Sequence, residues 1–137
     1  MEDRYLFKAK RLDTHDWILG FLSMHKTGKY FIRPIGGSAS SSEEVEKNTI
    51  CQCTGLKDKN GKLIWESDIM VANLDDAYLE DETYIRILWY ESGFCSKEKG
   101  SEDMSQIDKF DQEHFEVYGN IFDNKELLES EGQYDRE

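Results

Sequence analysis

Residues 54–71, TGLKDKNGKLIWESDIMV, constrain the fold of this chain more than any other segment. The Asn60-Gly61 pair is a strong short-range signal for a β-hairpin, because both residue types tolerate a positive φ. Apolar residues follow at 63–65, and Asp68 precedes a second short apolar run. Short apolar runs separated by turn residues are typical of strands. The segment therefore predicts a hairpin within a β-rich fold.

Two further segments carry strong strand patterns. Residues 83–91 (TYIRILWYE) consist largely of β-branched and aromatic residues, and residues 17–24 (WILGFLSM) are apolar but short for a helix. Gly20 interrupts the second segment and predicts a bulge or a close approach of two backbones. Weaker patterns predict strands over 4–10, 30–35, 49–53, 69–73 and 115–118, and the start of a return strand at 94–96.

The segments between these strands are polar. Residues 36–42 (GGSASSS) predict a flexible surface loop, and residues 43–48 predict a single helical turn. Five of the eight residues at 75–82 are acidic, which is typical of a solvated connection. Residues 97–109 predict another loop.

The C-terminal part predicts one short helix and a tail. Asn124 is placed to cap a helix over residues 125–131, and residues 132–137 predict a frayed tail. The length of 137 residues fits a single domain that can bury a core without disulfides. We therefore expect one mainly β domain over residues 1–137, a β-rich α+β fold with a short C-terminal helix.

Charge and cysteine content narrow the classes of function. The chain has 29 acidic and 17 basic residues and a net charge of −12, which argues against a duplex-DNA binder and permits an acidic surface that meets a basic protein. Three cysteines make a poor disulfide framework, so a reducing cytoplasm is expected. No apolar run is long enough to cross a membrane, and the charged residues 1–10 do not match a signal peptide.

Two segments partly match metal-binding patterns. Cys51 and Cys53 could share a zinc ion, but only Cys95 or scattered histidines are left to complete the site. Residues 58–61 (DKNG) resemble part of a calcium loop, but Leu56 then occupies the position of the first carboxylate. Strand packing and a hairpin turn explain both segments, so we expect no metal ion and no cofactor.

Few residues are candidates for catalysis. Asp68 precedes an apolar strand, where a carboxylate serves as a general base or, more commonly, accepts the backbone N–H groups of a turn. His15, His25 and His114 lie far apart, and none has a convincing nucleophile beside it. The GGSASSS segment lacks the Lys and the helix signal of a phosphate loop. We expect no enzymatic activity and assign no catalytic residue.

The aromatic residues and the acidic segment each have two interpretations. Trp65, Trp89 and Tyr90 fit the core of a small β domain, or they could stack on the bases of single-stranded nucleic acid. Residues 75–82 fit a solvated loop, or they could form an electrostatic docking surface.

Four pieces of the chain together resemble the YopX family of phage and prophage proteins. These are RYLFKAKR at 4–11 with WILG at 17–20, QCTGLKDKNGK at 52–62, WESDIM at 65–70, and EVYGNIFDN at 116–124 followed by ELL at 126–128. The chain departs from the family pattern in having Ser67 for Gly, Cys53 for an aromatic residue and Lys125 for Pro. Serine at position 67 leaves open whether the chain keeps the backbone conformation of the family's glycine. Cysteine in place of an aromatic residue indicates that Cys53 fills a packing position.

The resemblance implies a β-rich fold with an SH3-like small barrel component and extra strands. It also implies a phage or prophage origin and a bacterial cytoplasm, but it carries no established activity, cofactor or catalytic residue. We expect a non-enzymatic accessory protein that binds an unidentified protein partner. The alternatives are a single-stranded nucleic-acid binder, which needs a basic patch beside surface aromatics, and, less favoured, a hydrolase, which needs a polar cleft with perturbed pKa values. Exposed sheet edges leave self-association open.

Overall fold

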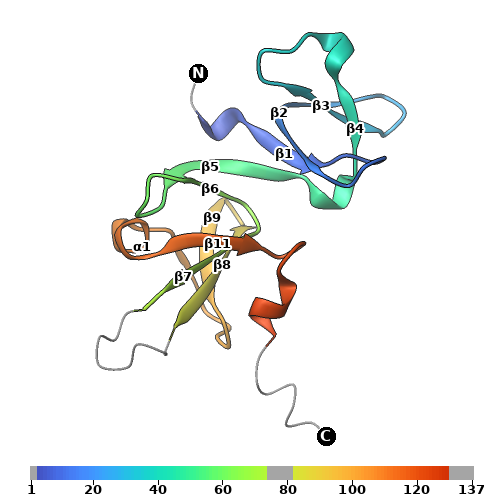
Figure 1. Cartoon of the computed structure of the whole chain (residues 1–137). Helices are drawn as coiled ribbons and strands as arrows, with labels where there is room; N and C mark the ends of the chain where they lie inside the picture. The colour runs from blue at the N-terminus through green and yellow to red at the C-terminus, as the bar shows by residue number, and fades with distance from the viewer. Residues whose placement is uncertain (1–2, 74–81, 130–137) are drawn as a thin grey trace, which may run out of the picture. The chain divides into compact units, whose positions relative to one another are not determined.

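The computed structural model describes residues 3–73 and 82–129, and the chain packs into two compact units, Met1–Gly55 and Leu56–Glu137 (Figure 1). Within the described ranges the protein is mainly β, as the sequence predicts, and its strands form antiparallel sheets. The sequence predicts one domain over residues 1–137. In the structure, each of the two units has its own buried apolar cluster. The two units are therefore described separately.

The first unit is an antiparallel sheet in the strand order β4-β3-β2-β1-β5. Its core, on one face of the sheet, is made by Ala9, Ile18, Ile32 and Val45. The elements are η1 (Asp3–Tyr5), β1 (Phe7–Lys10), β2 (Trp17–Met24), β3 (Tyr30–Pro34), η2 (Ala39–Ser41), β4 (Glu43–Val45), η3 (Lys47–Thr49) and β5 (Cys51–Lys57), where η denotes a 3-10 helix.

The expectation for Gly20 is confirmed. Gly20 pairs with Pro34 on the neighbouring strand, and a Cβ at this position would lie 1.9 Å from the carbonyl oxygen of Arg33. A glycine is therefore required here by the approach of two backbones, because any side chain would overlap β3. The strand predicted over residues 30–35 ends one residue earlier, at Pro34, which lacks the N–H group to continue the ladder.

Three local predictions in the first unit are wrong. The strand expected from residue 4 begins at Phe7, because Asp3–Tyr5 forms a 3-10 helix. The helical turn predicted over residues 43–48 is confined to its end, where the 3-10 helix η3 begins at Lys47: Glu43–Val45 is a strand paired with β3, because Val45 is buried in the apolar cluster. The loop predicted at 36–42 includes the 3-10 helix η2.

The second unit contains a five-stranded antiparallel sheet in the order β10-β9-β8-β7-β11. β5 runs from the first unit into the second, where β6 follows it after the Asn60-Gly61 turn. The remaining elements are β6 (Leu63–Trp65), β7 (Asp68–Ala72), β8 (Thr83–Tyr90), β9 (Gly93–Glu98), β10 (Met104–Gln106), α1 (Lys109–His114), β11 (Glu116–Asn120) and the 3-10 helix η4 (Lys125–Leu128).

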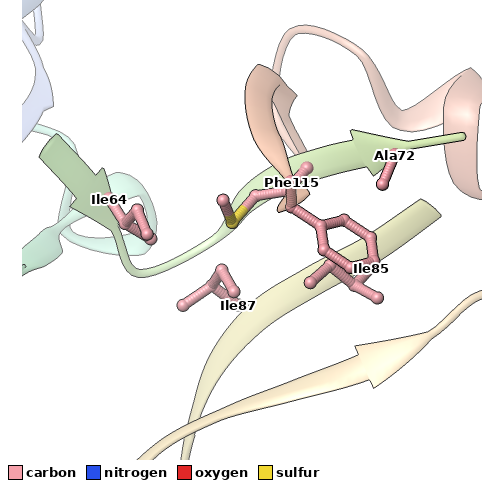
Figure 2. Packing of buried hydrophobic residues seen from close by; sticks show 6 residues of the cluster. Ile64, Ala72, Ile85, Ile87 and Phe115 are labelled. Atoms are coloured by element: carbon pink, nitrogen blue, oxygen red, sulfur yellow. The ribbon is translucent and has the colours of Figure 1, made fainter. Parts of the chain in front are cut away.

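The core of the second unit gathers residues from four segments of the chain. Figure 2 shows Ile64 of β6, Ala72 of β7, and Ile85 and Ile87 of β8 around Phe115, which precedes β11. Met70 completes the buried cluster. The buried residues of β8 alternate along the strand because only one of its faces meets this core.

The hairpin predicted at Asn60-Gly61 is present, with a loop of three residues. Asp58 N–H donates to Lys62 O at 2.8 Å, and Gly61 N–H donates to Asp58 O at 2.9 Å. Gly61 has φ +81°, whereas Asn60 is not among the residues with a positive φ. A type I turn followed by a left-handed glycine fits these bonds.

Several predictions in the second unit need correction. Residues 97–109 are not a loop: they contain β10 and the start of α1. The helix predicted over residues 125–131 is a short 3-10 helix, Lys125–Leu128, without a side-chain cap. Residues 75–81 of the predicted acidic loop and the predicted tail at 132–137 lie outside the described residues.

Candidate functional site

The conspicuous acidic residue of the hairpin, Asp58, is a structural acceptor. Its Oδ1 accepts the N–H groups of Asn60 and Lys62, both at 2.9 Å, and its Oδ2 accepts the N–H group of Val117 at 2.8 Å. The carboxylate is buried, with 6% of the residue exposed. Buried carboxylates are tolerated when backbone donors satisfy them, so Asp58 holds the turn in place.

The structural interpretation of Asp68 is confirmed. Asp68 is buried at the start of β7, and its Oδ2 accepts the N–H group of Trp65 at 2.8 Å across the turn. Ser67, inside this turn, has φ +75°, so the serine keeps a backbone conformation that favours glycine. Ser67 N–H donates to Ile87 O at 2.6 Å, and Ser67 O accepts from Ile121 N–H at 3.0 Å.

The cysteines and histidines are not brought together as a site. Cys51 and Cys53 are buried in the first unit, and Cys95 is buried in the second. Within residues 3–73 and 82–129, no group of three His, Cys, Asp or Glu side chains is arranged to hold a metal ion. Each histidine has its own local contact: His15 with Glu46, His25 with Thr27, and His114 with the carbonyl of Phe110.

The tip of the β8–β9 hairpin displays aromatic rings. Trp89 and Tyr90 are 49% and 47% exposed, whereas Trp65 is buried. The Trp89 ring packs edge-to-face on Phe94, with ring centroids 4.9 Å apart. Glu91 completes the turn with φ +58°. Trp65 therefore fits the interpretation as a core residue, whereas Trp89 and Tyr90 lie at the surface, where they are accessible to a ligand.

A second aromatic surface lies in the first unit, and we call it the Trp17 face. Lys8 Nζ and Lys10 Nζ lie 4.9 and 5.5 Å from the ring centroid of Trp17, and Arg33 Cζ lies 5.3 Å from that of Phe21. The strand registers pair Lys10 with Trp17 and Phe21 with Arg33. Because side chains alternate along strands, this face is opposite the apolar core of the sheet.

Formal charge is distributed unevenly between the units. Residues 1–55 hold seven acidic and eight basic residues, whereas residues 56–137 hold 22 acidic and nine basic residues. The negative charge of the whole chain thus belongs to the second unit.

A cleft in the second unit, with a volume of about 370 Å³, gathers polar side chains beside α1. Burial raises the pKa of Asp111 in this cleft, and the neighbouring Asp108 carboxylate adds to the rise. Asp108 and Asp111 form a reciprocal capping box: Asp111 N–H donates to Asp108 Oδ1, and Asp108 N–H donates to Asp111 Oδ2. The perturbed carboxyl group is therefore engaged in starting the helix.

The sequence profile described as YopX protein matches residues 23–129, most of the chain and parts of both units. This chain belongs to the YopX family. It is also similar to the crystal structure of protein EF1440 from Enterococcus faecalis, with 26% sequence identity and a TM-score of 0.56. The match covers 90% of this chain and 96% of that one. No protein with a curated description matches the sequence.

Three of the four pieces that carry the YopX resemblance contain a turn held by side-chain hydrogen bonds. Besides Asp58 and Asp68, the segment at 116–124 forms a compact turn after β11, in which Asn120 Oδ1 accepts the N–H groups of Phe122 and Asp123 at 2.9 Å. Asn124 does not cap the following helix, because its side chain accepts the N–H group of Asn120 instead.

The sequence gives no signal for a group of cations, Arg86, Lys97 and Lys99, that lines one pocket of the second unit, because these residues form no contiguous motif. Among the described residues, no helix has the length and apolarity needed to span a membrane.

Proposed function

We propose that this YopX-family protein is a non-enzymatic interaction module that holds a protein partner through the β8–β9 tip. The observation that carries the proposal is the exposure of two consecutive aromatic residues, Trp89 and Tyr90, at the end of the β8–β9 hairpin. Large aromatic side chains dominate the binding energy of protein interfaces. The contact with Phe94 already restricts the rotamers of Trp89 in the free protein, so less side-chain entropy is lost when a partner binds.

The charge of the second unit supports a partner with a basic surface. Residues 56–137 carry a large excess of carboxylates, and Glu91 lies directly beside the tip. Complementary charge steers association and rejects partners of like charge, while the aromatic residues supply affinity. The proposed interface therefore combines an aromatic centre with an acidic surround.

The proposal also includes an SH3-like component of the fold and a phage or prophage origin. The order β10-β9-β8-β7-β11 supports an SH3-like component: four strands follow one another as neighbours, and β11 returns to β7 after the short helix α1. Membership of the YopX family supports a phage or prophage origin and a place of action in the bacterial cytoplasm.

The test is a pull-down of the tagged full chain from bacterial lysate at moderate salt, with quantitative mass spectrometry. We expect a stoichiometric partner that is lost when Trp89→Ala and Tyr90→Ala are combined. Tyr118→Ala is the matched control, because Tyr118 is also an exposed aromatic residue of the second unit. Retention of every partner by the double variant, or the absence of any stoichiometric partner, would argue against the proposal.

A second candidate function is the binding of single-stranded nucleic acid by the Trp17 face. Cations stacked beside aromatic rings on an open sheet face are typical of surfaces that combine phosphate attraction with base stacking. Fluorescence anisotropy with an oligothymidylate at low salt tests it, and Arg33→Ala and Phe21→Ala should weaken binding. An unchanged anisotropy at saturating protein would dispose of this candidate.

Self-association is also part of the proposal. β10 and β11 stand at the two ends of the five-stranded sheet order, and unpaired strand edges can pair with a second copy. Light scattering coupled to size-exclusion chromatography measures the mass directly, and a constant monomer mass across concentrations would exclude pairing.

A further inference from the structure

The outer side of β8 and β9 carries three cations in one pocket of the second unit. Arg86 pairs with Lys97 across the two strands, and Lys99 N–H donates to Tyr84 O two residues further along. β9 ends at Glu98, but the hydrogen bond from Lys99 to Tyr84 continues the strand register by one residue, so Lys97 and Lys99 lie on one side. These three residues, with Glu98, Gly100 and Leu128, line a cavity of about 170 Å³, which we call the Arg86 pocket.

Arg86 is the unusual member of this group. Its Nε is buried and has no hydrogen-bond partner, and it is the sole buried side-chain nitrogen or oxygen without one among the described residues. A buried donor without a partner has given up its hydrogen bond to water without a replacement, which is unfavourable. Placing Lys97 directly opposite Arg86 adds the repulsion of like charges.

The local carboxylates do not neutralise the pocket. Lys97 Nζ approaches Glu102 Oε1 at 3.9 Å, but the Glu102 side chain is 98% exposed, so solvent screens the pair. Lys99 Nζ lies 5.5 Å from the ring centroid of Tyr84. Glu98 also lines the pocket, but it lies between Lys97 and Lys99, so its side chain projects to the other side of the strand. Three of the nine basic residues of an acidic unit thus line this one pocket.

Size and donor type define the ligand. The cavity is several times the roughly 30 Å³ that a water molecule occupies in the liquid, yet smaller than the roughly 300 Å³ at which drug-sized sites begin. It therefore has room for a small group rather than for a whole nucleotide. A guanidinium presents a planar fork of donors that matches phosphate oxygens, and ammonium groups add point charges.

We infer that the Arg86 pocket binds a phosphate group, with Arg86 as the fork and Lys97 and Lys99 as the flanking charges. The phosphate belongs either to a small molecule or to the phosphodiester backbone of a single strand that passes over the pocket. This inference is independent of the protein partner proposed above, because it concerns different side chains.

The first experiment is thermal unfolding of the full chain with inorganic phosphate up to about 20 mM at constant ionic strength, since a ligand that binds only the folded state raises the Tm. We expect a Tm increase of a few degrees for the wild type and none for Arg86→Met or Lys97→Met. Without phosphate, Arg86→Met should keep or raise the Tm, because it removes an unsatisfied buried charge. Lys109→Met is the matched control, since the Lys109 side chain is exposed and lies outside the pocket.

The second experiment identifies the source of the phosphate. Anisotropy of a labelled oligothymidylate is measured with and without competing inorganic phosphate. Displacement of the strand by phosphate, together with loss of binding in Arg86→Met, assigns the pocket to a phosphodiester. A Tm response to inorganic phosphate without strand binding assigns it to a small phosphorylated molecule.

Two results would overturn the inference. One is a wild-type Tm that does not respond to phosphate at constant ionic strength. The other is a response of equal size in the wild type, Arg86→Met and Lys97→Met, which would show that phosphate acts elsewhere on the chain.

Discussion

The carboxylate of Asp58 accepts the backbone N–H group of Val117 at 2.8 Å, although the two residues are 59 positions apart in sequence. The bond joins the β5–β6 hairpin turn to β11. The other oxygen of the same carboxylate holds the turn itself, through the N–H groups of Asn60 and Lys62. One buried acidic side chain thus fixes both a local turn and a long-range strand position.

Replacement of this carboxylate should be severe. Asp58→Ala leaves three backbone donors without their acceptor, so the free energy of unfolding should fall by about 3–5 kcal/mol. Urea denaturation followed by tryptophan fluorescence measures the change. Asp103→Ala, which removes an exposed aspartate of the same unit, is the control and should stay within about 0.5 kcal/mol of the wild type. Equal effects of the two substitutions would contradict the role assigned to Asp58.

The hairpin shows how far the sequence alone reaches. The Asn60-Gly61 pair predicts the turn because turn chemistry is local, and Gly61 has the positive φ that this requires. The partner of Asp58 is not predictable in this way, because Val117 approaches the turn only after β7 to β11 have assembled. The same reason explains the Arg86 pocket, whose cations come together only through the pairing of β8 with β9.

Short helices were predicted less well than strands. The segment expected to be a loop at 97–109 contains the Asp108 cap of α1, and the pair Asp108 and Asp111 was a local signal that could have been recognised. At Asn124 the sequence predicts a helix cap that the structure lacks. The Asn124 side chain instead closes the turn that begins at Asn120. Preferences of single residues are overridden when a tertiary or turn contact offers a better partner.

Ser67→Gly should stabilise the protein. Ser67 has φ +75°, a conformation that costs a residue with a Cβ about 1–2 kcal/mol, while glycine loses about 0.4–1 kcal/mol through the greater freedom of the unfolded chain. We expect a net gain of about 0.5–1 kcal/mol in the free energy of unfolding, measured by urea denaturation. Ser67→Ala separates the causes: it removes the hydroxyl but keeps the Cβ, and it should give no gain. A gain from alanine equal to that from glycine would show that backbone strain is not the reason.

Gly20→Ala should unfold or strongly destabilise the first unit. The new Cβ would lie 1.9 Å from Arg33 O, a backbone atom that moves only if the β2–β3 pairing opens. We expect a loss of at least about 3 kcal/mol, because overpacking against a backbone is not relieved by rotamer changes. Gly93→Ala is the matched control, since a Cβ there meets no atom within 4 Å and the φ of Gly93 is not positive. Circular dichroism melts of the two variants make the comparison, and a Gly20→Ala melt that coincides with the wild type would refute the close approach.

The Asp111 carboxyl should make a pH-dependent contribution to stability. Burial holds its pKa above the ordinary value of 3.8, so the folded state retains the proton more strongly than the unfolded chain does. The stabilising contribution is therefore fully present below the unfolded pKa and is lost as the pH rises through the folded pKa. When it is ionised, the half-buried carboxylate beside Asp108 weakens the fold relative to a neutral side chain.

Asp111→Asn isolates this effect. The amide oxygen can still accept the Asp108 N–H group, but it carries no charge, so the variant should be more stable than the wild type at pH 7. The gain should shrink as the pH falls through the raised pKa of Asp111, because the wild-type carboxyl then becomes protonated and neutral. Urea denaturation across this range measures the difference, and Asp103→Asn controls for the loss of one negative charge at the same cleft. A difference between Asp111→Asn and the wild type that stays constant with pH would show that the titration of Asp111 is not its cause.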